Sequence, residues 1–296
     1  MQVNTLLSPA NLRSVQGLEL LARRSVRTLL PGLNTSPRTG PGLEFSQYRT
    51  YQEGDDLRFL DWKLYARSDR FFIREAEKES QLTLRIILDA SASMLHEDQG
   101  IQKIDYARYL IATLAWLARQ QNDRIALHAW SGERLYQIAP GGSQRHFHRF
   151  LHQLLQIKCT GKFPATIAER GLEGAQPQNE LQVFISDLYE HQAELQQAMH
   201  RLSQSRNELV IFHLLAANEL ELDFRGSVTL EDLETGHRLQ LDRKAYQEQY
   251  QQKLQAYLQT IRRQVLDWRA MYELIKTNEL PGQALRTFLQ RRTRLL

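Results

Sequence analysis

The sequence predicts an α/β protein built on a doubly wound, mostly parallel sheet, with an N-terminal extension and a long C-terminal helix. From residue 82 onwards, short apolar runs alternate with segments of helical period. The last of these runs, residues 208–216, is almost continuously apolar, which is typical of strands that are covered on both faces. Repeated alternation of strand and helix brings parallel strands together and places helices over both faces. The chain has 296 residues, 42% of them hydrophobic, so it can form a core of ordinary size.

Each expected element of this sheet follows from its hydrophobic period. Ser131 and Gly132 separate two short apolar runs, which predicts a hairpin at that point. A further short helix is expected after Thr166. The expected strands are residues 82–88, 124–130, 134–139, 181–187 and 208–216, and the expected helices are residues 103–120, 144–157 and 191–204.

The two ends of the chain show different patterns. Residues 9–30 have the spacing of an amphipathic helix, whereas residues 43–80 mix aromatic and charged side chains without a clear period. Beyond a hairpin expected at 227–242, apolar residues from Tyr246 to Ile275 recur every three or four positions. This spacing predicts one long helix that packs on the sheet. We therefore expect three parts: 1–80, a helix and a segment docked on the main domain; 81–242, the main domain with the site; and 243–296, a helix and basic tail that complete the domain.

The composition argues against membrane-spanning and secreted classes. The sequence contains no run of 18 apolar residues, which a spanning helix would need. Its N-terminus lacks the basic and apolar regions of a secretion signal. Cys159 is the single cysteine and cannot form an internal disulfide, which fits a reducing compartment. We expect a cytoplasmic location.

Positive charge is concentrated near the C-terminus. Residues 243–296 contain 11 Lys and Arg against 4 Asp and Glu, whereas the formal net charge of the whole chain is only +4. Such a segment could bind nucleic acid. A solvated helix face is the favoured alternative, because the aromatic residues of this segment fall on its apolar side. We therefore expect protein partners rather than nucleic acid.

Oxygen-bearing side chains follow two of the expected strands. Asp89, Ser91 and Ser93 stand at alternate positions after the first strand, and Asp187 ends a later one. In doubly wound sheets, ligands bind outside the carboxyl ends of the strands. Carboxylate and hydroxyl oxygens are hard ligands that suit Mg²⁺ or Mn²⁺. With the hydroxyl of Thr166 at the start of the short helix, these five residues form the predicted metal site.

This loop has three alternative roles: a helix cap, an aspartyl nucleophile and a serine nucleophile. Loops rich in Ser and Asp also cap helices. An aspartyl nucleophile for phosphoryl transfer needs a second carboxylate two residues on, and Ser91 stands there. A serine nucleophile needs a base such as His96, but Ser91 and Ser93 lack the Gly-flanked turn of serine hydrolases. The sequence therefore predicts a non-enzymatic module, and a metal-dependent phosphoester hydrolase is the alternative.

Residues 42–80 carry a more specific pattern. The segment GLEFSQYRTYQEGDDLRFLDWKLYARSDRFFIREAEKES resembles the signature of the bacterial family called domain of unknown function 58. The tail segments DLETGHRLQLDRKAYQEQY and LPGQALRTFLQRR are also similar to that family, so the resemblance extends over about residues 40–292. The signature positions are Gly42, Glu44, Phe45, Arg49, Tyr51, Gly54, Asp55, Asp56, Arg58, Asp61, Trp62, Lys63, Ala66 and Arg67.

The loop DASASM, residues 89–94, resembles the metal-ion-dependent adhesion site (MIDAS) of von Willebrand factor A domains. The resemblance implies a von Willebrand factor A-like, Rossmann-type fold. It also implies partnership with a MoxR-type AAA+ ATPase in the maturation or remodelling of protein complexes, with a client carboxylate completing the metal shell. Thr166 lacks the Gly-Gly before it and the Asp after it that the family shows, and Thr160 is the alternative ligand.

The charged residues of the signature segment allow two interpretations. Buried Arg and Asp side chains are costly unless they pair with one another. The segment either docks on the main domain through a salt-linked network or exposes a surface to the ATPase or its client. The candidate partner surface consists of Arg49, Asp55, Asp56, Arg58, Asp61, Trp62, Lys63 and Arg67.

Overall fold

The structure, a computed structural model, divides the chain into two compact units. The main unit combines Met1–Asn34 with Gln81–Leu296, and the small unit is Thr35–Ser80. The N-terminal helix groups with the main unit, and the expected parts 1–80, 81–242 and 243–296, with docking of the signature segment, stay predictions. The residues described are 9–29, 45–52, 55, 57, 60–76, 81–164, 179–189, 194–205, 207–221, 227–231, 233 and 238–295.

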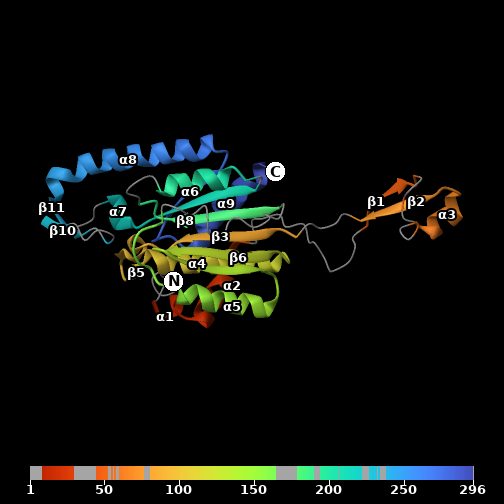
Figure 1. The fold of residues 1–296 in the computed structure, drawn as a ribbon, viewed down its shortest axis with the longest axis horizontal. Coiled ribbons are helices and arrows are strands. Elements are labelled where there is room, and N and C mark those ends of the chain that lie inside the picture. Colours follow the sequence, from red (N-terminus) through yellow and green to blue (C-terminus); the bar gives the residue numbers. More distant parts are fainter. Residues whose placement is uncertain are drawn as a thin grey trace. The chain divides into compact units, whose positions relative to one another are not determined.

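A six-stranded sheet forms the centre of the main unit, in the order β12-β9-β8-β3-β6-β7 (Figure 1). The first five strands in this order are parallel, and β7 pairs antiparallel with β6 as the predicted hairpin requires. The strands are β3 Thr83–Asp89, β6 Arg124–Ser131, β7 Arg134–Gly141, β8 Glu180–Ser186, β9 Glu208–Leu215 and β12 Met271–Lys276. The prediction of a mostly parallel α/β sheet is confirmed.

Helices cover both faces of the sheet. Successive strand residues point to opposite faces, so Ile86 and Leu88 join one core whereas Ile87 joins the other. On the first face lie α2 Val15–Leu29, α4 Lys103–Gln120, α5 Gln144–Gln156 and α9 Pro281–Leu295; on the second lie α6 Glu194–Ser203 and α8 Arg243–Asp267 (Figure 1).

The order of the strands locates a switch point in the sheet. From β3 the chain continues to β6 and β7 on one side, and it then returns to β8 and β9 on the other side. The two directions of winding therefore meet between β3 and β8. In doubly wound sheets the carboxyl ends of the strands at such a point form the usual ligand-binding crevice.

The helix expected at residues 9–30 is divided into α1 Pro9–Leu12 and α2. Ser14 causes the division: its side chain accepts a hydrogen bond from the backbone of Gly17 at 3.1 Å, which caps the start of α2. A side chain at position 17 would place its Cβ 2.2 Å from the carbonyl oxygen of Asn11, so the turn requires glycine. The buried side of α2, including Leu18, then packs on α4.

The prediction of one helix through residue 275 is wrong. α8 ends at Asp267, and Met271–Lys276 forms the parallel edge strand β12 beside β9. Tyr272 and Ile275, expected on the helical stripe, therefore lie on this strand. On α8 itself, Ile261 and Val265 belong to the second core. A stripe spaced by three or four residues thus continued by chance from a helix into a strand.

The turn that ends α8 lacks the glycine that usually marks the end of a helix in a sequence. Arg269 adopts a left-handed conformation with φ of 57°. The backbone N–H of Ala270 bonds to the carbonyl of Val265 at 3.1 Å, and that of Arg269 bonds to Leu266 at 2.9 Å. These two bonds form a Schellman motif, in which the left-handed position is usually glycine. Arginine at this position gives no indication that the helix ends.

Shorter elements complete both units. The expected hairpin at 227–242 is confirmed as β10 Ser227–Glu231 and β11 Arg238–Asp242, whereas the helix expected after Thr166 lies outside the described residues. In the small unit, β1 Phe45–Thr50 pairs with β2 Phe72–Ala76 around α3 Trp62–Ser68. Near the site lie η4 Ala92–Leu95, β4 Glu97–Asp98, β5 Ile101–Gln102 and α7 Ala217–Glu221.

None of the helices described is long and apolar enough to cross a membrane.

Candidate functional site

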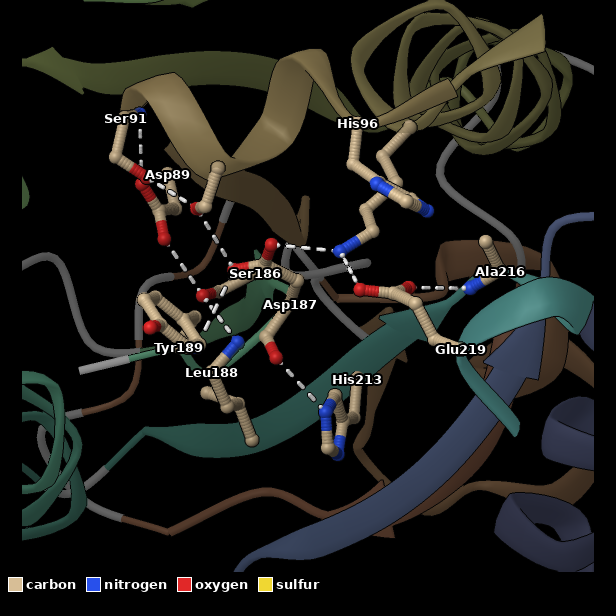
Figure 2. A network of polar contacts seen from close by, with 12 residues as sticks. Asp89, Ser91, His96, Ser186, Asp187, Leu188, Tyr189, His213, Ala216 and Glu219 are labelled. Carbon is tan, nitrogen blue, oxygen red and sulfur yellow. Dashed lines mark hydrogen bonds and ion pairs between the residues drawn. The ribbon is translucent and has the colours of Figure 1, made fainter. Parts of the chain in front are cut away.

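The structure brings four of the five predicted ligands together at the switch point. Asp89 ends β3, Ser91 and Ser93 lie in the loop and the 3-10 turn η4 that follow it, and Asp187 comes directly after β8. Because β3 and β8 are parallel neighbours, both carboxylates reach the same edge of the sheet (Figure 2). The four residues are buried, with exposed fractions of 0% for Asp89 and Ser91, 8% for Ser93 and 3% for Asp187.

Hydrogen bonds link these groups into one network. Asp89 Oδ1 accepts from the backbone N–H of Ser91 at 2.9 Å, and Asp89 Oδ2 accepts from the hydroxyl of Ser186 at 2.7 Å. The hydroxyls of Ser91 and Ser93 are 2.9 Å apart, and Ser93 donates to Asp187 Oδ1 at 3.1 Å. The two serines therefore bridge the two carboxylates, and Ser186 is a member that the sequence did not reveal.

The position of a threonine ligand is not decided by these contacts. Thr166 lies outside the described residues. The backbone of Thr160 is bonded to the first loop, since its N–H donates to the carbonyl of Ala90 at 3.2 Å. The Thr160 hydroxyl, however, lies 2.8 Å from the hydroxyl of Ser131 and not against a carboxylate. Thr166 and its alternative both stay predictions.

Burial and charge repulsion alter the carboxyl group of Asp89. Burial raises its pKa to about 7, and the negative charge of Asp187 acts in the same direction. Hydrogen bonds from Ser186 and Ser91 oppose this rise only in part. Among the described side chains, no cationic group is bonded to Asp89. The site thus carries negative charge that a cation would offset.

Lys103, the first residue of α4, supplies a cation that the sequence analysis missed. Its Nζ donates to Asp187 Oδ2 at 2.8 Å and to Glu219 Oε1 of α7 at 2.6 Å. Burial acts to lower the pKa of Lys103, but the charges of Asp187 and Glu219 outweigh it and hold the pKa above its usual value. A lysine at the start of a helix looks like an ordinary surface residue in the sequence, so no signal indicated this role.

His213 supports the site from the adjacent strand β9. Its Nε2 donates to the backbone carbonyl of Asp187 at 2.9 Å, and its Nδ1 accepts from the hydroxyl of Tyr272 at 2.8 Å. Burial lowers the pKa of His213 to about 4, so the ring is neutral at physiological pH. His213 thus holds the loop after β8 through Nε2 (Figure 2), while the bond of Nδ1 to Tyr272 orients the ring.

The donor set fits a hard divalent cation. It consists of carboxylate and hydroxyl oxygens, which suit Mg²⁺ or Mn²⁺, and Mg²⁺ usually keeps several waters. The residues that the structure describes contain no group of three or more His, Cys, Asp or Glu arranged to hold a metal. A cation here would therefore depend on the serine hydroxyls and on water or a partner's oxygen in addition to Asp89 and Asp187.

The residues of the candidate partner surface in the small unit differ in their exposure and contacts. Arg49 and Asp55 form an ion pair at 2.8 Å. Asp61 is buried and accepts hydrogen bonds from the backbone of Lys63 and Leu64, so it caps α3, and its role in a partner surface stays a prediction. Trp62, Lys63 and Arg67 are exposed, whereas Asp56 and Arg58 lie outside the described residues.

Comparisons with known sequences identify related proteins. The model of the family described as "Protein of unknown function DUF58" matches residues 47–259. The chain is 24% identical over 226 residues to an uncharacterized protein of Mycobacterium tuberculosis (strain ATCC 25618 / H37Rv), covering 75% of this chain and 71% of that protein. An uncharacterized protein of Mycobacterium bovis (strain ATCC BAA-935 / AF2122/97) matches with the same identity and coverage.

Comparisons with solved structures give more distant similarity. The conserved hypothetical protein BatB from Bacteroides thetaiotaomicron is 13% identical with a TM-score of 0.45, covering 72% of this chain and 99% of that chain. An aerotolerance-related membrane protein from Bacteroides fragilis is 15% identical with a TM-score of 0.45, covering 73% and 100%. The SpRpn10 VWA domain is 14% identical with a TM-score of 0.37, covering 45% and 75%.

Proposed function

This chain belongs to the DUF58 family, and we propose that it is a metal-dependent protein-interaction module. The observation that carries the proposal is the meeting of Asp89, Ser91, Ser93 and Asp187 at the switch point between β3 and β8. Their oxygen atoms suit Mg²⁺ or Mn²⁺, and their negative charge favours a cation.

In this proposal, Asp89, Ser91 and Ser93 would hold the cation, with Asp187 as the second carboxylate. A bound divalent cation would supply a positive centre for a carboxylate of a partner protein. Asp89 is bonded to Ser186 and to the backbone of Ser91, so its carboxylate is oriented before any ligand arrives. His213 fixes the backbone of Asp187 in the same way. These contacts hold the site in one geometry and so reduce the ordering cost of binding.

We propose a MoxR-type AAA+ ATPase as the partner, acting with this chain on the maturation or remodelling of protein complexes. The resemblance of the signature segment and of the 89–94 loop to their families supports this choice. The exposed Trp62, Lys63 and Arg67 of the small unit provide a further surface for such a partner. A cytoplasmic location would be consistent with this role.

Binding of a purified MoxR-type ATPase tests the proposal. We expect the wild-type chain to bind it in Mg²⁺ and to lose binding in EDTA, and the Asp89→Ala variant to lose binding in both. Asp267→Ala, which removes an exposed carboxylate at the end of α8, beside the opposite edge of the sheet, is the matched control and should bind normally. Full binding by Asp89→Ala, or by the wild type in EDTA, would contradict the proposal.

The same proteins test the phosphoester hydrolase. His213 is unsuited to act as a general base, because it is buried, burial lowers its pKa to about 4, and both of its ring nitrogens are already bonded. Mg²⁺-dependent turnover of p-nitrophenyl phosphate by the wild type that disappears in Asp89→Ala would nevertheless favour the hydrolase over the interaction module.

A further inference from the structure

We propose that Lys103 is a built-in cation of the candidate metal site, which holds Asp187 when no divalent cation is bound and lowers the affinity of the site for such cations. The inference rests on the proposed function, because it concerns the regulation of the same site. It assigns to Lys103 a positioning role, since the ammonium group would act on the cation through Asp187.

The ammonium group of Lys103 is held between two carboxylates. It lies 2.8 Å from Asp187 Oδ2 at the end of β8 and 2.6 Å from Glu219 Oε1 on α7, and its side chain is only 3% exposed. Glu219 is itself fixed, because its Oε2 accepts from the backbone N–H of Ala216 at 2.8 Å (Figure 2). Lys103 is therefore clamped and is not a mobile surface side chain.

The contacts of Asp187 divide between its two oxygens. Oδ1 accepts from the hydroxyl of Ser93 at 3.1 Å and from the backbone N–H of Tyr189 at 3.3 Å, so it faces the serine loop. Oδ2 accepts from Lys103. The carboxylate of Asp187 thus contacts the predicted ligand Ser93 through one oxygen and the ammonium group of Lys103 through the other.

This arrangement has two electrostatic consequences. The ammonium group reduces the repulsion among the carboxylates of Asp89, Asp187 and Glu219, so the site can remain ordered without a metal. It also repels any cation placed near Asp187, and Coulomb forces in a buried site are stronger than in water. The same lysine should therefore stabilise the metal-free protein and weaken metal binding.

A purely structural salt bridge would behave differently. If Lys103 only secured the start of α4 to α7, its removal would change the stability of the fold but not the affinity for Mg²⁺. Affinity for the metal is therefore the measurement that separates the two roles, and it does not depend on any activity of the protein.

Isothermal titration of the full chain with Mg²⁺ tests the proposal. Lys103→Met keeps most of the side-chain length but removes the charge, and we expect it to bind Mg²⁺ roughly tenfold or more tightly than the wild type. Glu219→Gln removes a negative charge and leaves Lys103 less compensated, so it should bind several-fold more weakly. Lys253→Met, on the exposed face of α8, is the control for a general change in charge and should match the wild type within about twofold.

The two variants are expected to change the affinity for Mg²⁺ in opposite directions. Equal affinity of wild type and Lys103→Met would overturn the competition by Lys103 while leaving the proposed metal site intact. If no protein bound Mg²⁺, both the inference and the metal-dependent part of the proposed function would fail. If Lys103→Met did not fold, Lys103→Gln, which removes the charge but keeps a polar group beside Asp187, would decide: tighter binding than the wild type supports the inference, and unchanged binding overturns it.

Discussion

The strands β3 and β8 carry a buried polar cluster at each end, and the two clusters balance their charges differently. Near the start of the strands, Arg85 donates to both carboxylate oxygens of Glu180, at 2.8 and 2.5 Å. At the carboxyl ends, the cluster contains the carboxylates of Asp89, Asp187 and Glu219. Lys103 forms ion pairs with Asp187 and with Glu219. One cluster pairs one anion with one cation, whereas the other contains more anions than cations.

The difference indicates which cluster supports the fold and which can serve a ligand. Buried charges are tolerated when they are paired and hydrogen-bonded. The Arg85–Glu180 pair meets this condition by itself, and the nearby His128, with its pKa lowered to about 4 mainly by burial, adds no charge at neutral pH. At the other end, burial and the charge of Asp187 raise the pKa of Asp89, so that end favours a cation from outside.

The largest expected effect breaks the paired cluster. Glu180→Gln leaves Arg85 as a buried charge without its anion, and we expect the free energy of unfolding to fall by about 3–5 kcal/mol. Urea denaturation measures this loss, which should be the same with and without Mg²⁺. The exposed Glu133→Gln is the control, with a change within about 0.5 kcal/mol. A loss that Mg²⁺ reversed would contradict the division of roles between the clusters.

A smaller effect is expected from adding the cation to the unbalanced cluster. At a free Mg²⁺ concentration of 100 times the dissociation constant, the wild type should gain about 2.7 kcal/mol in its free energy of unfolding. Asp89→Asn removes the negative charge and should show no such gain. Denaturation curves in Mg²⁺ and in EDTA compare the two proteins, and a similar gain in both would remove Asp89 from the ligand set.

The pH dependence of the metal-free protein probes the same carboxylate. Burial raises the pKa of Asp89 to about 7 in the folded protein, from an ordinary value of 3.8. The folded state therefore holds a proton that the unfolded state releases between about pH 4 and 7, and rising pH favours unfolding. In EDTA, we expect this group to reduce the free energy of unfolding by up to about 1.4 kcal/mol per pH unit in that window.

Asp89→Asn is the control for this pH dependence, because it lacks the titrating group. Its free energy of unfolding should fall less steeply between pH 4 and 7 than that of the wild type. Parallel stability curves for the two proteins would show that Asp89 does not titrate in this range.

The smallest expected effect concerns a buried carboxylate in the small unit. Asp61 accepts hydrogen bonds from the backbone of Lys63 at 2.9 Å and Leu64 at 3.0 Å, so its charge is stabilised by a helix start. Asp61→Ala should destabilise α3 by about 1 kcal/mol, independently of Mg²⁺. Hydrogen exchange of the α3 amides in the full chain measures this, with the exposed Lys63→Ala as control. Unchanged protection in Asp61→Ala would show that the cap contributes little.

Sequence patterns located one half of the site but not the other. Asp89 and Asp187 could be predicted because each follows a recognisable buried strand, and parallel neighbours bring such ends together. Lys103 could not, since its partners lie 84 and 116 positions away and a lysine at a helix start has no distinctive pattern. The fold shows the same limit. The alternation of strands and helices could be predicted from the sequence, whereas the left-handed turn at Arg269 that ends α8 could not.

Two hydroxyl contacts of α8 link this helix to the surroundings of the candidate site. Tyr257 donates to the backbone carbonyl of Leu188, next to Asp187, and Tyr250 donates to that of Glu219 at 2.7 Å. The buried Ile261 and Val265 anchor the same helix in the second core. The loop after β8 and the helix α7, which carry the two carboxylates that hold Lys103, are therefore both tied to one helix, α8.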